Sequence, residues 1–254
     1  MDYITFPPCE ELKEFISHFW ILRQDRSKHE VPAYYLTANS MTELTFFFSN
    51  ESHIPELLFT SIQGQTDKAQ QLPANSSVDI LGVSIFPYSI PYLFGIPARE
   101  INNLSIPIKE ILGESSEIIS ESISNATTDK SQINILSKYF TTVLAGVSLS
   151  DRRIIQAVHE IKRKNGNVDI KTLSNKICLS ERQFERQFAV NVGFTPKLYS
   201  RIVRFESALN SLAYIDSFTE VAYMNGYYDQ AHFIREFKAF SALSPTEYFS
   251  MLPT

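Results

Sequence analysis

Residues 184–188 read Phe-Glu-Arg-Gln-Phe, and residues 233–237 read Phe-Ile-Arg-Glu-Phe, 49 positions further along the chain. The flanks repeat at the same spacing: Thr195-Pro196 returns as Ser244-Pro245, and Tyr199 returns as Tyr248. A repeat at a fixed period indicates one structural motif that occurs twice. This repeat therefore decides the architecture of the C-terminal part of the chain.

The first copy of the repeat predicts a helix-turn-helix motif. A short amphipathic helix begins near Asp169, and Ser180 is the expected N-cap of a second helix. Phe184 and Phe188 are four residues apart, so both lie on the buried face of that second helix. The side chains left on its outer face are Arg182, Gln183, Glu185 and Arg186.

The second copy predicts the same motif. Phe218 lies in its first helix, Gly226 supplies the turn, and Asp229 caps the second helix. Phe233 and Phe237 again lie on the buried face. Short polar and basic side chains at the start of a second helix suit insertion into a major groove. The side chains available there are Gln230, His232, Arg235 and Lys238.

A long helix from Pro196 to about Tyr214 is expected between the two motifs. Its apolar residues recur at helical spacing, and Pro196 suits the first position of a helix. About 18 helical residues span roughly 27 Å. With the widths of the helices added, that length approaches the roughly 34 Å of one DNA turn.

In this region the chain resembles the AraC/XylS family of bacterial transcription regulators. The resemblance rests on the run from Gly226 to Lys238, on Leu243-Ser244-Pro245 and on Tyr248, and it covers about residues 151–250. It implies two helix-turn-helix motifs, joined by a rigid helix, that enter adjacent major-groove segments on one face of double-stranded DNA.

By position, the resemblance also implies which side chains contact DNA. The base-facing residues would be Arg182, Glu185 and Arg186 in the first motif, and Gln230, Ala231, His232 and Arg235 in the second. Phosphate contacts are expected from Lys197, Arg201 and Lys238. Glu185 either accepts a hydrogen bond from a cytosine amino group or opposes nonspecific binding, and the sequence leaves both open.

Two positions depart from the family pattern. Ala242 replaces the usual glycine, which puts a left-handed helix cap there in question. Phe249 replaces a frequent arginine, which removes one expected phosphate contact.

Charge separates the chain into two parts. The 254 residues carry 23 Lys and Arg against 28 Asp and Glu, a net −5 that argues against a nucleic-acid binder. Residues 1–150 hold 9 basic and 17 acidic side chains, a net −8, whereas residues 151–254 hold 14 and 11, a net +3. Opposite signs indicate two domains with different roles. We expect a cupin-like sensor or dimerisation domain over 1–147, including its C-terminal helices, and a double helix-turn-helix domain over 148–254.

The N-terminal part predicts an α+β domain with an antiparallel sheet. Three segments read as strands: residues 44–48, 56–62 and 78–86. Apolar residues between Leu12 and Trp20 step by 3, 1, 3 and 1, which is typical of a helix. Two further helices are expected between Lys109 and Gly146, the first with Ile118 on its apolar stripe and the second with Asp129 as its N-cap. These helices are our candidate dimer contact. Residues such as Phe15 to Trp20 and Gly95 to Pro97 resemble a cupin-like domain found ahead of AraC-type modules, which implies sensing and dimerisation.

Several classes of protein are disfavoured. The closest glycines, Gly82 and Gly95, are 13 residues apart, so neither a dinucleotide fingerprint nor a P-loop fits. We expect no signal peptide, and no apolar run approaches the roughly 18 residues of a membrane span. His18, His29 and His53 give no pair at metal-ligand spacing. Cys9 and Cys178 are expected to be reduced thiols in a cytoplasmic protein, with Cys178 buried.

The sequence therefore predicts a DNA-binding transcription regulator that is not an enzyme and needs no metal or cofactor. Its expected partners are double-stranded DNA, a small-molecule effector, a second copy of the chain and RNA polymerase, and no membrane. Two alternatives stay open: a cupin-like metal enzyme, and an interaction protein whose DNA module has lost its function. Aromatic residues such as Trp20, Phe46, Phe48 and Phe86 either build the core or line a cavity for the effector.

Overall fold

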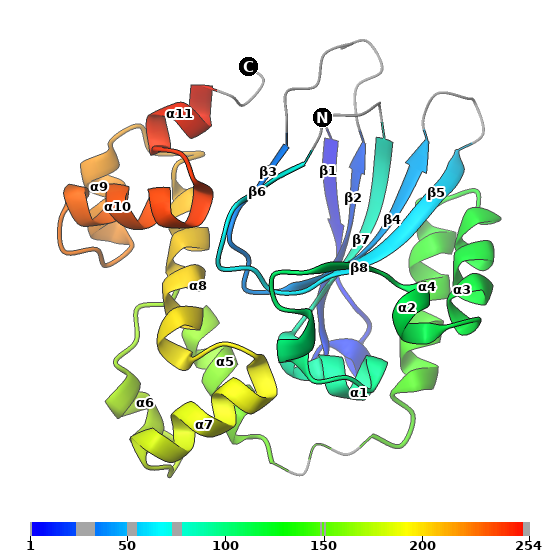
Figure 1. The fold of residues 1–254 in the computed structure, drawn as a ribbon, viewed down its shortest axis with the longest axis horizontal. Coiled ribbons are helices and arrows are strands. Elements are labelled where there is room, and N and C mark those ends of the chain that lie inside the picture. The colour runs from blue at the N-terminus through cyan, green and yellow to red at the C-terminus, as the bar shows by residue number, and fades with distance from the viewer. Residues whose placement is uncertain are drawn as a thin grey trace. The chain divides into compact units, whose positions relative to one another are not determined.

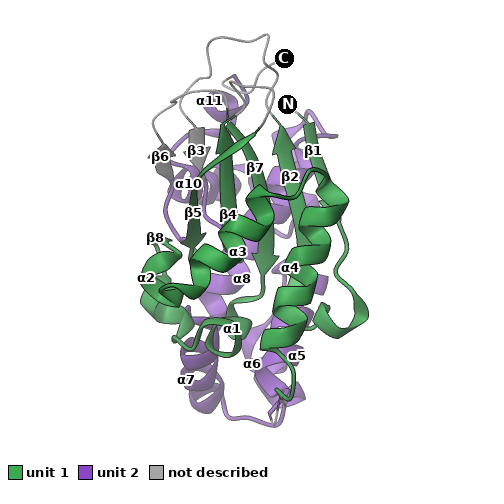
Figure 2. Ribbon diagram, turned by 90° about the vertical axis from the view of Figure 1, so that its right-hand side faces the viewer, with its two compact units in different colours: residues 1–31, 41–65, 74–148 green, residues 32–40, 66–73, 149–254 purple. Residues whose placement is uncertain are grey.

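A computed structural model describes residues 2–23, 34–49, 55–72, 78–147, 149 and 151–250. The chain divides into two compact units. Unit 1 comprises residues 1–31, 41–65 and 74–148, and unit 2 comprises residues 32–40, 66–73 and 149–254 (Figure 2). Figure 1 labels the helices and strands. The fold class predicted from the sequence is confirmed, since an antiparallel sheet domain precedes a helical helix-turn-helix region. Unit 2 also takes in two segments of the N-terminal half that nothing in the sequence indicates.

Unit 1 is built on one sheet with the strand order β1-β2-β7-β4-β5-β8, in which every paired neighbour is antiparallel. Figure 2 shows α3 and α4 in front of this sheet. The strands are β1 (Asp2–Phe6), β2 (Ile16–Arg23), β4 (Thr42–Ser49), β5 (Glu56–Gln63), β7 (Val78–Ile85) and β8 (Ser105–Pro107). The helices are α1 (Ile90–Phe94), α2 (Lys109–Leu112), α3 (Ser115–Ser124) and α4 (Asp129–Val143), with short 3-10 turns at Glu10–Leu12, Pro87–Ser89 and Ala98–Ile101.

Side chains alternate across this sheet and separate a core face from a polar face. Phe19 pairs with Val83, and Val83 pairs with Leu44, so these buried side chains share the core face. On the other face the indole of Trp20 donates to the carboxylate of Glu43 at 2.9 Å. The hydroxyl of Ser84 donates to the second oxygen of the same carboxylate at 2.5 Å.

Trp20 lies against the strand beside it. A Cβ atom at Gly82 would lie 2.0 Å from the Trp20 ring, so only glycine leaves room for the indole. Tyr3 packs beside Trp20 with ring centroids 5.7 Å apart. Burial and the nearby Glu43 carboxylate raise the pKa of Tyr3 to about 12, so its phenol stays protonated at neutral pH.

The helical stripe expected from Leu12 to Trp20 is wrong. Residues 16–23 form strand β2, and the register of its pairing with β7 shifts between Ile16 and His18. A bulge of this kind breaks the period of two, because it adds a residue to one strand of the pair. The apolar spacing then imitates a helix.

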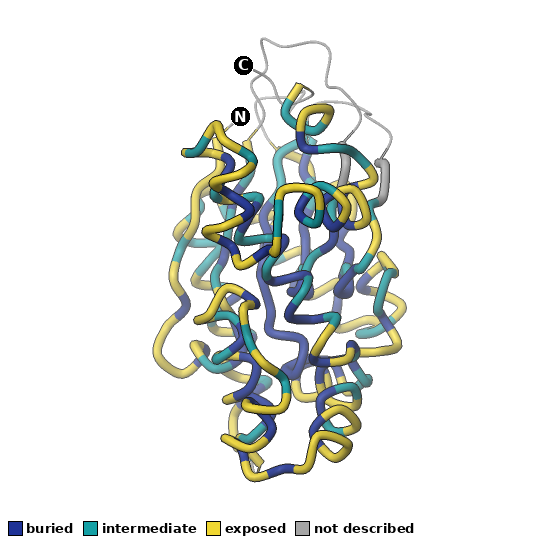
Figure 3. Tube along the Cα trace, turned by 90° about the vertical axis from the view of Figure 1, so that its left-hand side faces the viewer, coloured by how far each residue is buried: buried dark blue, intermediate teal, exposed yellow. Residues whose placement is uncertain are grey.

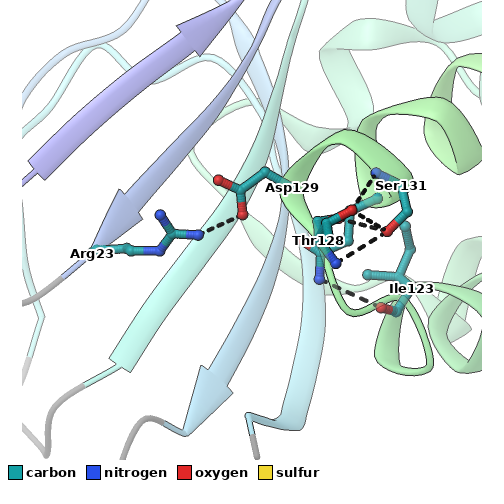
Figure 4. A network of polar contacts seen from close by, with 6 residues as sticks. Arg23, Ile123, Thr128, Asp129 and Ser131 are labelled. Atoms are coloured by element: carbon teal, nitrogen blue, oxygen red, sulfur yellow. Dashed lines mark hydrogen bonds and ion pairs between the residues drawn. The ribbon is translucent and has the colours of Figure 1, made fainter.

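The two helices expected after Lys109 are three. Gly113 separates α2 from α3, and Ile118, which was expected on the apolar stripe, is 71% exposed. Helix α4 begins at Asp129, but its N-cap is Thr128, which forms a capping box with Ser131. Figure 4 shows Asp129 turned instead toward Arg23 at the end of β2, with which it forms an ion pair.

Unit 2 contains seven helices among its described residues, together with a two-stranded pair formed by β3 (Tyr34–Leu36) and β6 (Gln70–Leu72). The helices are α5 (Arg153–Arg163), α6 (Ile170–Lys176), α7 (Glu181–Val192), α8 (Pro196–Ser211), α9 (Phe218–Met224), α10 (Gln230–Ser241) and α11 (Pro245–Ser250). Buried and exposed stretches alternate along these helices, as amphipathic packing requires (Figure 3). No helix in the described part of the chain is both long and apolar enough to span a bilayer.

The segment that follows β3 is bound to the helices of unit 2. The backbone amide of Ala38 donates to the carbonyl of Phe240 at 2.9 Å. The amide and the hydroxyl of Ser40 both donate to the Glu206 carboxylate, at 2.6 and 2.7 Å. The ammonium of Lys162 donates to the Ser40 hydroxyl at 2.6 Å and to Glu206 at 3.2 Å. Helices α5 and α8 thus hold this segment through one buried serine.

Candidate nucleic-acid interface

The first helix-turn-helix motif consists of α6 and α7. The carboxylate of Asp169 caps α6 by accepting from the amide of Thr172 at 2.7 Å. Ser180 caps α7 in a capping box with Gln183, as the sequence predicts. The rings of Phe184 and Phe188 are fully buried and meet edge to face at 5.5 Å. The capping box therefore fixes the residue at which α7 begins, and the two buried rings fix which face of α7 packs on the core.

The second motif consists of α9 and α10. Ser217 caps α9, and the Asp229 carboxylate caps α10 by accepting from the amide of His232 at 2.6 Å. Gly226 makes the turn with φ +72°. The rings of Phe233 and Phe237 are fully buried, 5.7 Å apart. The predicted second motif therefore has its expected cap, turn and core.

The sequence distance between equivalent residues of the two motifs differs between their first and second helices. Their second helices are 49 residues apart, since Ser180 and Asp229 are the equivalent caps. Their first helices are 48 apart: Asp169 and Ser217 are the caps, and Cys178 and Gly226 both turn with positive φ. The second motif therefore has one additional residue before its second helix. This residue is Tyr228, which is 86% exposed.

Helix α8 connects the motifs. It has 16 residues, begins with Pro196 and is capped by Thr195. Sixteen residues span about 24 Å, somewhat less than the sequence suggests, because the helix ends at Ser211. The apolar stripe of α8 is fully buried at Ile202 and Phe205 and partly buried at Leu198 and Leu209.

In the first motif the candidate base contacts lie together on one exposed face of α7. Arg182, Glu185 and Arg186 are all exposed. Gln183 is exposed as well, but its side-chain oxygen accepts from the amide and the hydroxyl of Ser180, at 3.2 and 2.9 Å. The capping box thus occupies the acceptor of Gln183, while the three charged side chains point away from the core.

In the second motif the candidates differ more in their surroundings. Ala231 and Arg235 are exposed. Gln230 accepts from the hydroxyl of Thr219 at 2.8 Å, which ties the start of α10 to α9. His232 is partly buried beside the ring of Tyr227, and its Nε2 lies 4.0 Å from the carboxylate of Glu236.

Of the candidate phosphate contacts, Lys197 and Lys238 are exposed, whereas Arg201 is partly buried and already forms an ion pair. The Arg201 guanidinium donates to Glu236 at 2.5 Å and lies over the ring of Phe240, 5.2 Å from its centroid. A phosphate contact by Arg201 would compete with this ion pair.

Sequence reasoning missed the cluster to which Arg201 belongs. Glu236 is only 7% exposed and accepts from both Arg201 and Arg204, and Arg204 also lies over the ring of Tyr227 at 4.8 Å. Burial, and then the nearby Glu236 carboxylate, raise the pKa of the Tyr227 phenol. A signal was present, because Glu236 lies at helical spacing between Phe233 and Phe240 in an otherwise apolar stripe.

Comparison with known proteins agrees with this geometry. Residues 173–251 match the family model described as a helix-turn-helix domain. The C-terminal part of the chain carries an AraC-type helix-turn-helix domain. Residues 4–107 match a family model described as a domain of unknown function (DUF6597). No curated protein matches the chain at a significant level.

Solved structures with the same fold include ToxT from Vibrio cholerae. An apo lysine-to-alanine variant of ToxT has a TM-score of 0.50 at 13% identity, over 92% of this chain and 98% of that chain. A second ToxT structure has a TM-score of 0.50 at 10% identity, over 100% of both chains. ToxT with a bound unsaturated fatty acid has a TM-score of 0.49 at 14% identity, over 92% and 94%. The first two of these structures share the fold over 92% and 100% of this chain, so the likeness includes the sheet domain that precedes the AraC-type domain.

The turn of the first motif corrects one prediction about the cysteines. Cys178 is exposed, not buried, and adopts φ +56° at the position that Gly226 occupies in the second motif. Cys9 is exposed as well. A tight left-handed turn directs its side chain outward, so the small size of Cys178 does not place it in the core.

The alternative of a metal enzyme finds no support in the part of the chain that the structure describes. No group of three His, Cys, Asp or Glu residues there lies so as to hold a metal ion. The Nε2 of His18 lies 3.3 Å from the hydroxyl of Tyr3. His29 and His53 lie outside the described residues.

Proposed function

We propose that this protein is a sequence-specific regulator of transcription that binds double-stranded DNA through the two motifs of its AraC-type domain. The observation that carries the proposal is the pair Arg186 and Arg235. These exposed arginines occupy equivalent positions on the second helices of two capped motifs, which one 16-residue helix connects.

The start of each second helix is suited to a major groove. Aligned peptide dipoles make the N-terminus of α7 and of α10 attractive to phosphates. The arginine that follows reaches the base edges, where its planar guanidinium pairs with both acceptors of guanine. Between cap and arginine, the exposed side chains are polar or small: Glu181, Arg182, Gln183 and Glu185 on α7, and Gln230 and Ala231 on α10.

Selection from a random duplex library tests the proposal. An enriched motif with two half-sites about one helical turn apart is the expected result. Arg186→Ala and Arg235→Ala should each weaken binding to the selected duplex by about 1–3 kcal/mol and relax the preference at the contacted base pairs. Absence of any enriched sequence would instead favour a module that has lost DNA binding.

We further propose that unit 1 binds a small-molecule effector. The support is the polar face of its sheet, where the Trp20 ring, the phenol of Tyr3 and the Glu43 carboxylate lie side by side. Aromatic rings beside a few directed polar groups are the usual composition of a ligand site. Repeating the selection with cell metabolites identifies an effector if it changes the affinity for the enriched duplex, and Glu43→Gln should abolish that change.

The helices of residues 109–146 are our proposed contact for dimer formation. Ile118 is the most exposed large apolar side chain of α3, at 71%. Light scattering at tens of micromolar tests this: a dimer that Ile118→Glu converts to a monomer supports the contact, and a monomeric parent contradicts it. We also propose a contact with RNA polymerase, which in vitro transcription on the selected duplex tests.

A further inference from the structure

The two motifs of the AraC-type domain, each taken with the helix that precedes it, carry different charge. Residues 151–195, which include the first motif, hold 9 Lys and Arg against 5 Asp and Glu, a net +4. Residues 196–254, which include α8 and the second motif, hold 5 against 6, a net −1. The net +3 of the domain therefore arises entirely from its first part.

Residues 151–168, which include α5, contribute 5 Lys and Arg against 2 Asp and Glu to the first part. Equivalent positions of the two motifs show a further source of the difference. At the spacing of 48 residues that relates the first helices, Lys171 of α6 corresponds to Thr219 of α9, and Lys176 corresponds to Met224. At the spacing of 49 that relates the second helices, Arg182 corresponds to Ala231. All six side chains are exposed. The second motif thus presents neutral groups at three positions where the first has cations, and of these Lys176 is paired with Glu160 at 3.1 Å. The first motif also carries the exposed Glu181 and Glu185, where the second has Gln230 and Ile234.

The arginines nearest to the second motif do not compensate for this loss. Arg201 and Arg204 of α8 both point to the buried carboxylate of Glu236, and each lies over an aromatic ring. In the first motif the position of Glu236 is taken by Gln187, which carries no charge. Within the described residues 218–250, the exposed cations are Arg235 and Lys238.

We propose that the two motifs have unequal roles on DNA. The first motif supplies most of the electrostatic affinity, which is independent of sequence and depends on salt. In this division Arg182, in the first turn of α7, contacts a phosphate, and Arg186 contacts the bases. The second motif contributes sequence discrimination with few phosphate contacts. This inference rests on the proposed function, because it divides DNA binding between the motifs.

The physical reason is that the two kinds of contact respond differently to salt. Each phosphate that a cation neutralises releases condensed counterions and steepens the dependence of log K on log salt by about 0.9. Hydrogen bonds and apolar contacts to base edges release none. The exposed side chains of the second motif are suited to contacts with base edges. Tyr223, Met224 and Tyr228 are 68%, 66% and 86% exposed, and thymine methyl groups accept apolar contacts.

Two variants of the full chain that each remove two positive charges test the division. The first combines Lys171→Thr with Arg182→Ala, which gives the first motif the residues of the second. The second combines Arg235→Ala with Lys238→Ala. Dissociation constants are measured between about 50 and 200 mM salt, on the selected duplex and on an unrelated duplex.

The expected result is asymmetric. The Lys171/Arg182 variant loses about two units of salt slope and at least tenfold in affinity for the unrelated duplex. The Arg235/Lys238 variant loses at most half of that slope, but it no longer distinguishes the selected duplex from one whose second half-site is scrambled. Equal losses of slope, or a larger loss in the Arg235/Lys238 variant, would overturn the inference.

Controls separate this inference from the proposed function. A parent protein that binds no duplex contradicts DNA binding itself, whereas a parent that binds and variants that lose slope equally contradict only the division. All four side chains are exposed, so thermal unfolding of both variants should match the parent. If the Lys171/Arg182 variant unfolds at a lower temperature, Arg182→Gln alone replaces it, with an expected loss of about one unit of slope.

Discussion

Ala242 ends α10 in a left-handed conformation, with φ 61° and ψ −2°. The missing glycine therefore does not abolish the left-handed cap, as the sequence had led us to question. In the first motif Gly193 has the same role with φ 93°. A side chain with a Cβ atom in this region costs roughly 1–2 kcal/mol, because the Cβ approaches the following carbonyl. At this cap the second motif carries the strain, whereas in the turn the first motif carries it, at Cys178 with φ +56°.

Ala242→Gly should therefore raise the free energy of unfolding of the domain by about 1 kcal/mol. Gly193→Ala is the matched control and should lower it by a similar amount. Urea titration monitored by circular dichroism measures both changes. If both substitutions lowered the free energy of unfolding, the Ala242 methyl group would make a packing contact that outweighs the strain.

At the scale of elements, Glu236 fixes α10 to α8. Breaking a buried ion pair by removing one partner costs about 3–5 kcal/mol, because the other charge stays buried without its partner. Here Arg201 remains partly exposed, so we expect Glu236→Gln to lower the free energy of unfolding by about 3 kcal/mol. Gln187→Glu in the first motif is the control at the equivalent position. If Glu236→Gln were as stable as the parent, the side chains of Arg201 and Arg204 would have turned outward into solvent.

Glu160 gives the first motif a dependence on pH. Its carboxylate on α5 accepts from Arg163 and from Lys176 of α6, and these contacts lower its pKa to about 2. A lowered pKa stabilises the folded state above the unfolded value near 4.5, and this stabilisation disappears as the pH falls toward 2.

Unfolding curves of the parent and of Glu160→Gln, recorded between pH 6 and about 2, measure this contribution. We expect the parent to be the more stable protein at pH 6 and the difference to shrink as the pH falls through the acidic range. A difference that stays constant over the whole range would mean that the pairs of Glu160 contribute by packing alone.

The same elements show what a sequence can predict. Local signals defined the motifs: Asp169, Ser180 and Asp229 cap the predicted helices because a capping side chain bonds an amide only three residues away. The features that the sequence did not predict depend on pairing between residues far apart in the chain. Strand β2 imitated a helix because its bulge forms only against β7, and the Glu236 cluster needs two arginines from another helix. The additional Tyr228 changes the repeat spacing within one turn, which the strong match of the second helices concealed.

At the scale of the whole molecule, the chain passes from unit 2 to unit 1 between Ser40 and Met41. Strand β4 begins directly afterwards, at Thr42, and supplies Glu43 to the polar face of the sheet. Ser40 itself is held by Glu206 of α8, the helix that connects the two motifs. The proposed effector site and the helix between the motifs are therefore linked through a few consecutive residues.

This link predicts that the carboxylate of Glu206 holds the segment around Ser40 in place. Hydrogen bonds to a charged group contribute roughly 1.5–3 kcal/mol, and Glu206 accepts two of them from Ser40. Glu206→Gln removes the charge, so the amide of Ser40 should exchange its hydrogen at least tenfold faster, while amides within β4 keep their protection. Lys162→Met is the matched variant: it removes the ammonium but leaves the acceptors of the Ser40 amide in place, and should have a smaller effect. If both variants leave the exchange of Ser40 unchanged, the Ala38–Phe240 backbone bond alone holds the segment, and an effector would have to act on α8 by another route.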